Sequence, residues 1–123
     1  MINTRTMKKS IILEKSELFA LSIIECYKEM KNQNEFILSK QLLRSGTSIG
    51  ANVNEAQAAI SKKDFISKMS IASKEARETN YWLRLCEQSK IVQYDFDPLI
   101  FESKEIVRIL TSIVKTSQLN IKN

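Results

Sequence analysis

The sequence predicts an all-α protein, an antiparallel up-down-up-down bundle of four helices in which residues 1–123 form a single domain. The chain has only two glycines and one proline, which is too few for the many turns of a β fold. Its apolar residues recur at the spacing that places them on one face of a helix. Short polar segments separate these stretches, and short connections make neighbouring helices antiparallel.

The first helix is expected at residues about 10–31, because its apolar residues repeat at heptad spacing. Ile12, Phe19 and Cys26 form one row along this helix. Residues 31–34, Lys-Asn-Gln-Asn, then read as a polar turn that ends it.

The second helix, expected at residues about 36–59, contains both glycines of the chain, Gly46 and Gly50. Each glycine costs about 1 kcal/mol relative to alanine inside a helix, so a loop at residues 46–50 is the alternative. One apolar face continues through both glycines, which favours an unbroken helix. Gly46 and Gly50 would then lie on one side of it and allow another helix to approach closely.

The last two helices are expected at residues about 61–90 and 97–117. The Ser61 hydroxyl can cap the first turn of the third helix, while Asp64 reaches back to it. Asp97 suits the N-cap of the fourth helix and Pro98 its first helical position. The core face of the third helix is predicted to contain Phe65, Met69, Ala72, Ala76, Thr79, Leu83 and Cys86.

The apolar stripes are wider than a lone four-helix bundle needs, which favours a homo-oligomer. The third helix has a second row beside its core row, containing Ile71, Glu75, Glu78, Trp82 and Leu85. Leu18 and Leu21 in the first helix and Ile109 in the fourth also remain outside the core rows. The alternative is that these are scattered surface hydrophobic residues, which are common.

Composition argues against an enzyme. Histidine is absent, which removes histidine-based triads, general bases and metal sites together. The two cysteines, Cys26 and Cys86, are isolated within apolar patterns, where buried small hydrophobic residues are more common than a disulfide or a metal pair. We therefore expect no catalytic residues, no metal and no cofactor.

We expect a cytoplasmic protein that does not cross a membrane. No stretch reaches the roughly 18–20 apolar residues that a transmembrane helix needs. The basic start of the chain is followed by an apolar run that Glu14, Lys15 and Glu17 soon interrupt, unlike a secretory signal.

The positive charge is unevenly distributed. The net charge is +5, and both ends of the chain are basic without opposing carboxylates. These end residues are Arg5, Lys8 and Lys9, and Arg108, Lys115 and Lys122. Basic ends favour nucleic-acid binding, although they also improve solubility.

One face of the third helix combines cations with an aromatic residue and carries no acid. Its members are Lys63, Lys74, Arg77, Tyr81 and Arg84. Such a face can contact phosphates and stack on a base. The alternative is an ordinary solvated face.

Carboxylates offer the only enzyme hypothesis. Glu75 and Glu78 share a helix face, and Glu55 could lie opposite them and help to hold magnesium for nucleotide hydrolysis. Three Glu residues on two helices are few for a magnesium site. Arg44, Ser48 and Asn52 could instead pair with these carboxylates. We therefore favour a structural polar network, formed by Arg44, Ser48, Asn52, Glu55 and Glu78.

Three segments carry a family resemblance: L-L-R-S-G-T-S-I-G-A-N-V-N-E-A (Leu42 to Ala56), K-D-F-I-S-K-M-S-I-A, and E-A-R-E-T-N-Y-W-L. Together they resemble the four-helix bundle proteins encoded in 23S rRNA intervening sequences, over most of the chain. Many relatives have a glycine shortly after the Glu at position 55, whereas this chain continues Ala56-Gln57-Ala58. The turn into the third helix is therefore expected to be tighter or more helical.

The resemblance implies a bacterial, cytoplasmic, homopentameric ring that binds nucleic acid and has no known catalysis. The accessory variability protein of diversity-generating retroelements has a similar fold and partners a reverse transcriptase and nucleic acid. Our leading hypothesis is thus a homo-oligomeric RNA- or DNA-binding bundle. The alternatives are an adaptor for a polymerase-type protein and, less favoured, the carboxylate-metal hydrolase.

Overall fold

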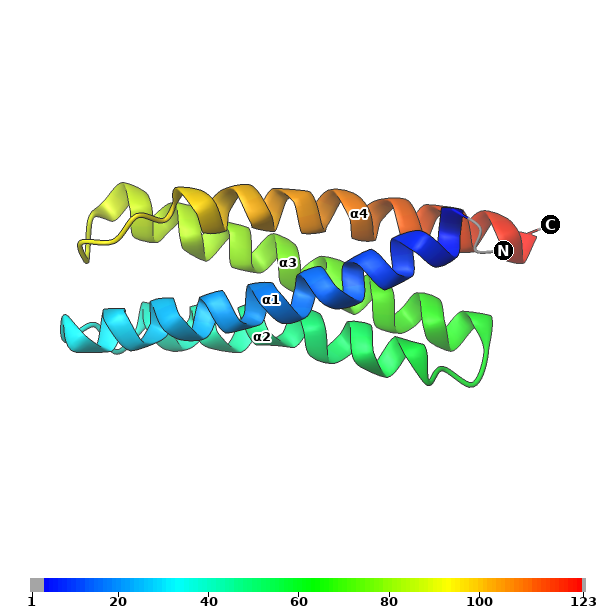
Figure 1. The fold of residues 1–123 in the computed structure, drawn as a ribbon, viewed down its shortest axis with the longest axis horizontal. Coiled ribbons are helices and arrows are strands. Elements are labelled where there is room, and N and C mark those ends of the chain that lie inside the picture. The colour runs from blue at the N-terminus through cyan, green and yellow to red at the C-terminus, as the bar shows by residue number, and fades with distance from the viewer. Residues whose placement is uncertain (1–3, 123) are drawn as a thin grey trace.

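The computed structural model describes the backbone of residues 4–122 and the side chains of residues 11–121. Within that part of the chain, four helices follow one another: α1 (Thr4–Asn32), α2 (Leu38–Gln57), α3 (Lys62–Ser89) and α4 (Asp97–Lys122). Figure 1 shows that they run up and down side by side, with both chain ends at one end of the bundle. The predicted all-α, four-helix, up-down fold is confirmed.

Two predicted helix ends differ clearly from the structure. α1 begins at Thr4, well before residue 10, and α4 continues to Lys122, well beyond residue 117. Ser117 is buried, whereas residues 118–121 are exposed, so α4 packs against the bundle as far as Ser117 and then extends beyond it. Both ends of the chain are polar, so the apolar pattern did not show that α1 and α4 extend this far. The basic side chains of Arg5, Lys8, Lys9 and Lys122 lie outside the described side chains.

The inner helix ends lie within two residues of the predicted ones. α2 spans Leu38–Gln57 where residues 36–59 were expected, and α3 spans Lys62–Ser89 where residues 61–90 were expected. Ala58 follows α2 as its C-cap, and Ser61 then begins the next helix as its N-cap. The turn between α2 and α3 is therefore short and contains no glycine.

Glu35 caps the start of α2, a role that the sequence did not reveal. Its carboxylate accepts hydrogen bonds from the backbone amides of Ile37 (3.1 Å), Leu38 (3.0 Å) and Ser39 (2.7 Å). Burial alone would raise the pKa of Glu35, but the amides of Leu38, Ser39 and Ile37 outweigh burial and lower this pKa. The anion also interacts favourably with the positive end of the helix dipole.

The other two helix starts differ from the prediction in detail. The Ser61 hydroxyl accepts the Asp64 amide at 3.0 Å, as predicted, but the Asp64 carboxylate accepts the Ile60 amide (3.2 Å) and not that of Ser61. Asp97 is the first residue of α4 and not the residue before it. Its amide donates to the Asp95 carboxylate at 3.2 Å, so Asp95 takes the capping role.

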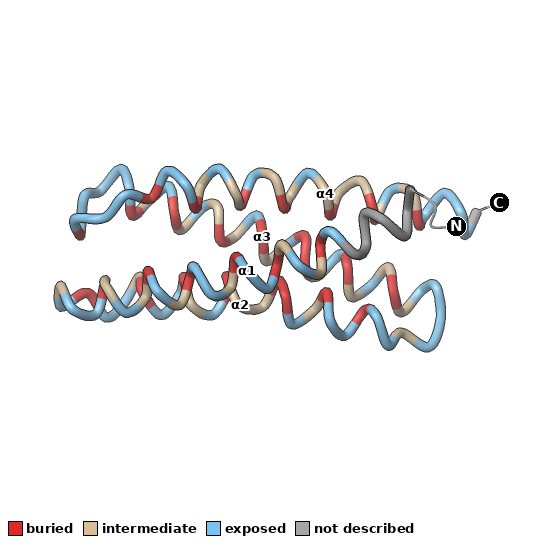
Figure 2. Tube along the Cα trace, viewed as in Figure 1, coloured by how far each residue is buried: buried red, intermediate tan, exposed pale blue. Residues whose placement is uncertain are grey.

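The core lies along the axis between the four helices, where Figure 2 shows the buried positions facing inward. All the residues predicted for the core face of α3 are buried. The largest fully buried side chains are Ile12, Ile23, Met30, Leu42, Ile49, Met69, Leu83, Ile106, Leu110 and Ile113. Cys26 and Cys86 are also buried and not in a disulfide. Burial raises the pKa of Cys26 to about 12 and that of Cys86 to about 11, so both thiols stay protonated.

The two glycines of α2 lie against α1, and the helix continues through both, so the loop alternative is wrong. A Cβ atom on Gly46 would come within 2.8 Å of Ile23, and one on Gly50 within 3.3 Å of the Ser16 carbonyl oxygen. The close approach of α1 and α2 therefore depends on the missing side chains. None of the described helices is both long and apolar enough to span a membrane.

Candidate nucleic-acid interface

The five residues of the predicted basic face are all exposed on α3: Lys63, Lys74, Arg77, Tyr81 and Arg84. They do not form a single cluster. Lys63 is in the first turn of α3 and Arg84 is near its end, about 30 Å away at the rise of an α-helix. Only the part of the face from Lys74 to Arg84 lies beside residues of α4 that add to it.

α4 completes this face. The Arg77 guanidinium donates to the Thr111 hydroxyl at 3.2 Å, which joins the two helices at the surface. A shallow groove of about 250 Å³ lies there. It is lined by Ser70, Ser73, Arg77, Thr111, Val114 and Lys115. The groove thus offers two cations and three hydroxyls and no carboxylate, which is the chemistry that binds a phosphate group.

Tyr81 lies one turn beyond Arg77 and is held by its neighbours. Its ring packs against Trp82 with centroids 5.2 Å apart and planes at 61°. The Arg84 guanidinium lies over the Tyr81 ring, 6.0 Å from its centroid. Arg84 is itself oriented by Asn80, which accepts its Nε–H at 2.9 Å and donates to Ser103 of α4 at 2.9 Å. The aromatic ring is therefore positioned, yet still 47% exposed.

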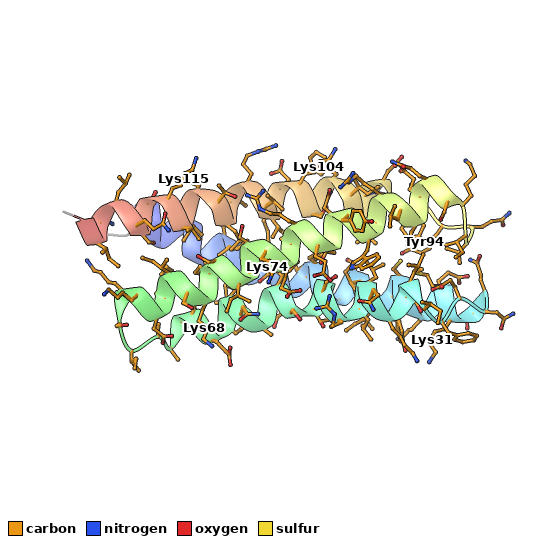
Figure 3. All side chains as sticks on the ribbon, turned by 180° about the vertical axis from the view of Figure 1, so that it is seen from behind. Lys31, Lys68, Lys74, Tyr94, Lys104 and Lys115 are labelled. Atoms are coloured by element: carbon orange, nitrogen blue, oxygen red, sulfur yellow. The ribbon has the colours of Figure 1, made fainter. Side chains whose placement is uncertain are left out.

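Two further lysines of α4 extend the same side of the bundle. Lys104 and Lys115 are exposed and share a helix face with Thr111. In Figure 3, Lys74 lies on α3 and these two lysines on α4, along the side that the two helices form. We call the set the α3–α4 basic surface: Lys74, Arg77, Tyr81, Arg84, Lys104 and Lys115. From the sequence, Lys115 was predicted only as part of a basic end, and Lys104 was not predicted to belong to this surface. The spacing of Lys104, Thr111 and Lys115 was the available signal.

The cations of this surface form no ion pair with any described carboxylate, whereas several other cations of the protein do. The paired cations are Lys15 with Glu102, Lys28 with Glu25, Arg44 with Glu75 and Glu78, Lys68 with Glu55, and Arg108 with Glu105. Arg108 was expected to contribute to a basic end, but Glu105 at 3.0 Å offsets its charge.

Acidic residues border the surface at the connection between α3 and α4. Glu87, Asp95 and Asp97 line an open pocket there together with Lys90. A hydrogen bond with Asp97, followed by burial and the negative charge of Asp97, raises the pKa of Glu87. This concentration of negative charge would repel a phosphate backbone, so the usable surface runs from Arg84 toward the other end of α3.

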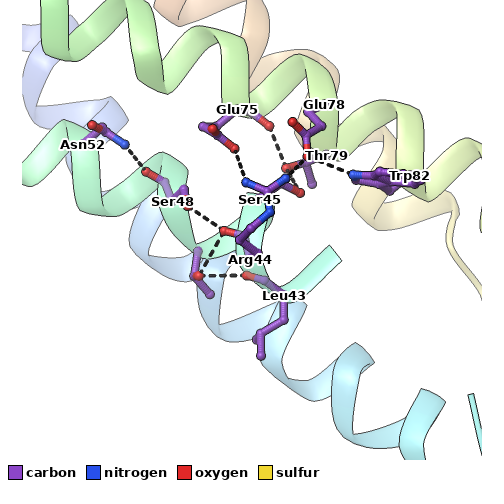
Figure 4. A network of polar contacts seen from close by, with 10 residues as sticks. Leu43, Arg44, Ser45, Ser48, Asn52, Glu75, Glu78, Thr79 and Trp82 are labelled. Carbon is purple, nitrogen blue, oxygen red and sulfur yellow. Dashed lines mark hydrogen bonds and ion pairs between the residues drawn. The ribbon is translucent and has the colours of Figure 1, made fainter. Parts of the chain in front are cut away.

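The neighbouring side of α3, which faces α2, carries a polar network with satisfied charges (Figure 4). The Arg44 guanidinium contacts Glu75 at 3.3 Å and also Glu78. Glu78 in turn accepts the Trp82 indole N–H at 3.0 Å. Beneath them, the buried Thr79 hydroxyl bonds with that of Ser45 at 2.9 Å.

The structure separates the residues expected in this network. Arg44 and Glu78 pair, but Glu55 lies apart from them and pairs with Lys68 at 3.3 Å. Ser48 and Asn52 bond to backbone carbonyl oxygens one turn earlier in α2, at 2.6 and 2.9 Å. These two side chains therefore support α2 and do not bridge it to α3.

The carboxylates do not gather into a metal site. Glu55 does not face Glu75 and Glu78, and Arg44 already contacts both of those residues. Over the described side chains, no group of three or more His, Cys, Asp or Glu could hold a metal ion. The arrangement suggested for magnesium-dependent hydrolysis is thus not formed by these residues.

The fold and the site define an up-and-down four-helix bundle whose α3–α4 basic surface forms no ion pair with a described carboxylate. A family model described as 23S rRNA-intervening sequence protein matches residues 8–112. The chain belongs to this family. No curated protein matches it.

A solved structure supports the same assignment. The chain is similar to a protein of unknown function from the S23 ribosomal protein family of Bacteroides thetaiotaomicron. The two are 45% identical, with a TM-score of 0.83, and the match covers 88% of this chain and 98% of that one. Because the match covers 88% of the chain, the likeness extends over most of the bundle and is not limited to isolated motifs.

Proposed function

We propose that this protein is a non-enzymatic nucleic-acid-binding bundle that contacts the phosphate backbone through the α3–α4 basic surface. The observation that carries the proposal is the groove between α3 and α4, where Arg77 and Lys115, which have no described carboxylate partner, lie beside three hydroxyls. Arg44, by contrast, is paired with carboxylates within the fold. Unpaired cations around hydroxyls suit an anionic ligand.

The size of the surface suits a polymer more than a small anion. Lys74 and Arg84 are ten positions apart on α3, which corresponds to about 15 Å along the helix. Lys104 and Lys115 cover a similar length on α4. Several phosphates of one strand can therefore be contacted at once, and each contact releases counterions. The family is named for sequences within 23S rRNA, which supports RNA as the first ligand to test.

Fluorescence anisotropy with a structured RNA and a duplex DNA, titrated with salt, tests the proposal. We expect binding that weakens steeply with salt, and an Arg77→Glu/Arg84→Glu variant that loses about a hundredfold in affinity. The matched control is Lys31→Glu/Lys40→Glu, which changes the net charge equally at exposed lysines outside the surface. Equal losses in the two variants would show that only net charge matters and would reject the surface.

Absence of binding even at low salt would reject nucleic-acid binding altogether. An acidic protein, such as a polymerase-type partner, would then be the ligand that the same cations fit. That alternative predicts a stable protein complex with little affinity for free RNA, and it loses that complex in the same Arg77→Glu/Arg84→Glu variant.

We also propose that the protein is a homo-oligomer, joined through the side of α1 that borders α4. Leu18 and Leu21 of α1 are each 56% exposed, and Phe101 of α4 is 62% exposed. A groove of about 320 Å³ between the two helices is lined by Leu18, Phe19 and Leu99 among others. Leu18 lines this groove, whereas Leu21 and Phe101 lie outside its lining. An exposed apolar residue at a groove, with further exposed apolar residues on the same two helices, is typical of a subunit contact. The family resemblance supports a pentamer.

Light scattering coupled to size-exclusion chromatography tests this assembly. We expect a single species several times the 14.2 kDa of the chain, and a Leu18→Glu/Leu21→Glu variant that dissociates. Ile60→Glu serves as the control, because Ile60 is 94% exposed in the turn between α2 and α3. A monomeric wild-type protein would reject the proposal.

A further inference from the structure

Tyr81 is an unusual member of the α3–α4 basic surface because it carries no charge. A phosphate backbone can be bound by cations and hydroxyls, and the Tyr81 hydroxyl is one such donor, but the face of its ring has no role in phosphate contact. The contacts with Trp82 and Arg84 hold this ring in place on a regular helix. A fixed and partly exposed ring next to cations is suited to stacking on a base.

The position of Tyr81 matches the groove beside it. Arg77, which lines the groove, precedes Tyr81 by four residues and therefore lies one helical turn away, about 6 Å along the axis. A phosphate between Arg77 and Lys115 would leave the base of the same or the next nucleotide within reach of the Tyr81 ring. The groove and the ring together thus form a site for one nucleotide of a longer strand.

A paired base cannot use such a site. In a duplex both faces of each base are covered by the neighbouring pairs, so only phosphates, sugars and base edges are accessible from outside. Unpaired bases can turn outward and stack on an aromatic side chain, which is how many proteins hold single strands.

We infer that the ligand of the α3–α4 basic surface is single-stranded nucleic acid, with one phosphate in the groove at Arg77 and Lys115 and an adjacent base stacked on Tyr81. The inference rests on the proposed function, since it selects one class of nucleic acid for the same surface. It adds a specific role for Tyr81 that simple phosphate binding does not require.

The test compares a short single-stranded RNA of mixed sequence with the same RNA annealed to its complement, both measured by anisotropy with the full chain. We expect tighter binding of the single strand. Tyr81→Ala should weaken single-strand binding about tenfold or more, in keeping with the loss of one stacked base, and leave duplex binding unchanged. Tyr81→Phe is the matched control and should bind as the wild type does, because it keeps the ring. Thermal unfolding of both variants checks that the bundle is intact.

The outcomes separate the two proposals. Unchanged single-strand binding by Tyr81→Ala, or a duplex bound as tightly as the single strand, would overturn the inference and leave nucleic-acid binding by the surface in place. No binding of either RNA would overturn both. A loss in Tyr81→Phe equal to that in Tyr81→Ala would assign the effect to the hydroxyl and would also overturn base stacking.

Discussion

The two sides of α3 use charge differently. On the side that faces α2, Arg44 contacts both Glu75 and Glu78, and Glu78 also accepts the Trp82 indole. On the side that borders α4, the neutral Thr111 hydroxyl is the only partner of Arg77 among the described side chains. In the sequence, both sides carry charged residues at helical spacing, and the side with Glu75 and Glu78 also carries apolar residues. The charges of the first side belong to the contact between two helices, whereas those of the second side remain available to a ligand.

The largest expected effect comes from making the same substitution on both sides. Arg44→Glu removes the partner of Glu75 and Glu78 and adds a like charge, which should lower the free energy of unfolding by about 2 kcal/mol. Arg77→Glu should change it by no more than about 0.5 kcal/mol, because it breaks no ion pair with a described residue. Urea unfolding followed by circular dichroism measures both. Equal losses of stability would remove the distinction between the two sides.

The next effect concerns Glu35, another carboxylate whose charge the fold satisfies on the α2 side of the bundle. Glu35→Gln keeps the shape but loses the charge that accepts three backbone amides. It should cost about 1–1.5 kcal/mol at neutral pH. Urea unfolding at several pH values is the measurement.

The Glu35 effect should depend on pH in a defined direction. The pKa of Glu35 is lowered in the folded protein, so its charge stabilises the fold fully above the unfolded-state pKa of about 4.3. This contribution disappears as the pH falls through the lower folded-state pKa. The wild type and Glu35→Gln should therefore converge in stability in acid, and a difference that persists there would contradict the capping role.

A smaller loss is expected from Thr79→Val, which replaces a buried hydroxyl by a methyl group of similar size. The Thr79 hydroxyl bonds with Ser45, and without it the Ser45 hydroxyl loses a partner inside the bundle. The expected cost is about 1 kcal/mol by thermal or urea unfolding. Ser67→Ala, an exposed position on the same helix, is the control and should be nearly neutral.

The smallest effect is expected from Lys115→Ala on the α3–α4 basic surface. Loss of one phosphate contact should weaken RNA binding about threefold at moderate salt. It should also reduce the slope of the logarithm of the binding constant against the logarithm of the salt concentration by about one. Stability should not change. An unaltered salt dependence would remove Lys115 from the interface and restrict the phosphate groove to Arg77 and its hydroxyl neighbours.

The helices and the core followed from the sequence because helix periodicity is a local property. Every residue predicted for the core face of α3 is buried, since apolar residues at helical spacing can be buried on only one side. The outer ends of α1 and α4 were predicted too short, because polar residues end an apolar pattern without ending a helix. Glu35 was missed as a cap because it precedes α2 by three residues, outside the usual N-cap position.

The site was only half predictable. The sequence grouped the cations of α3 because they share one helix face. That Lys104 and Lys115 lie on the same surface depends on the packing of α3 against α4. Glu55 was grouped with Arg44 because both lie on α2, yet the two helices place Lys68 closer to it. Which charges face one another across helices depends on rotation and register, and these are set by the whole core.

The pattern of apolar residues in the chain was therefore enough to specify four helices, their inward faces and an up-down order. The tertiary structure alone decided which polar groups are satisfied within the fold and which have no charged partner among the described residues. The physical reason is the separation of the interacting residues along the chain. The periodicity of burial depends on neighbours within one helix, whereas an ion pair such as Arg44 with Glu75 joins residues on two different helices. Gly46 illustrates the difference. Its position in α2 follows from the sequence, but its close approach to Ile23 of α1 is known only from the tertiary structure.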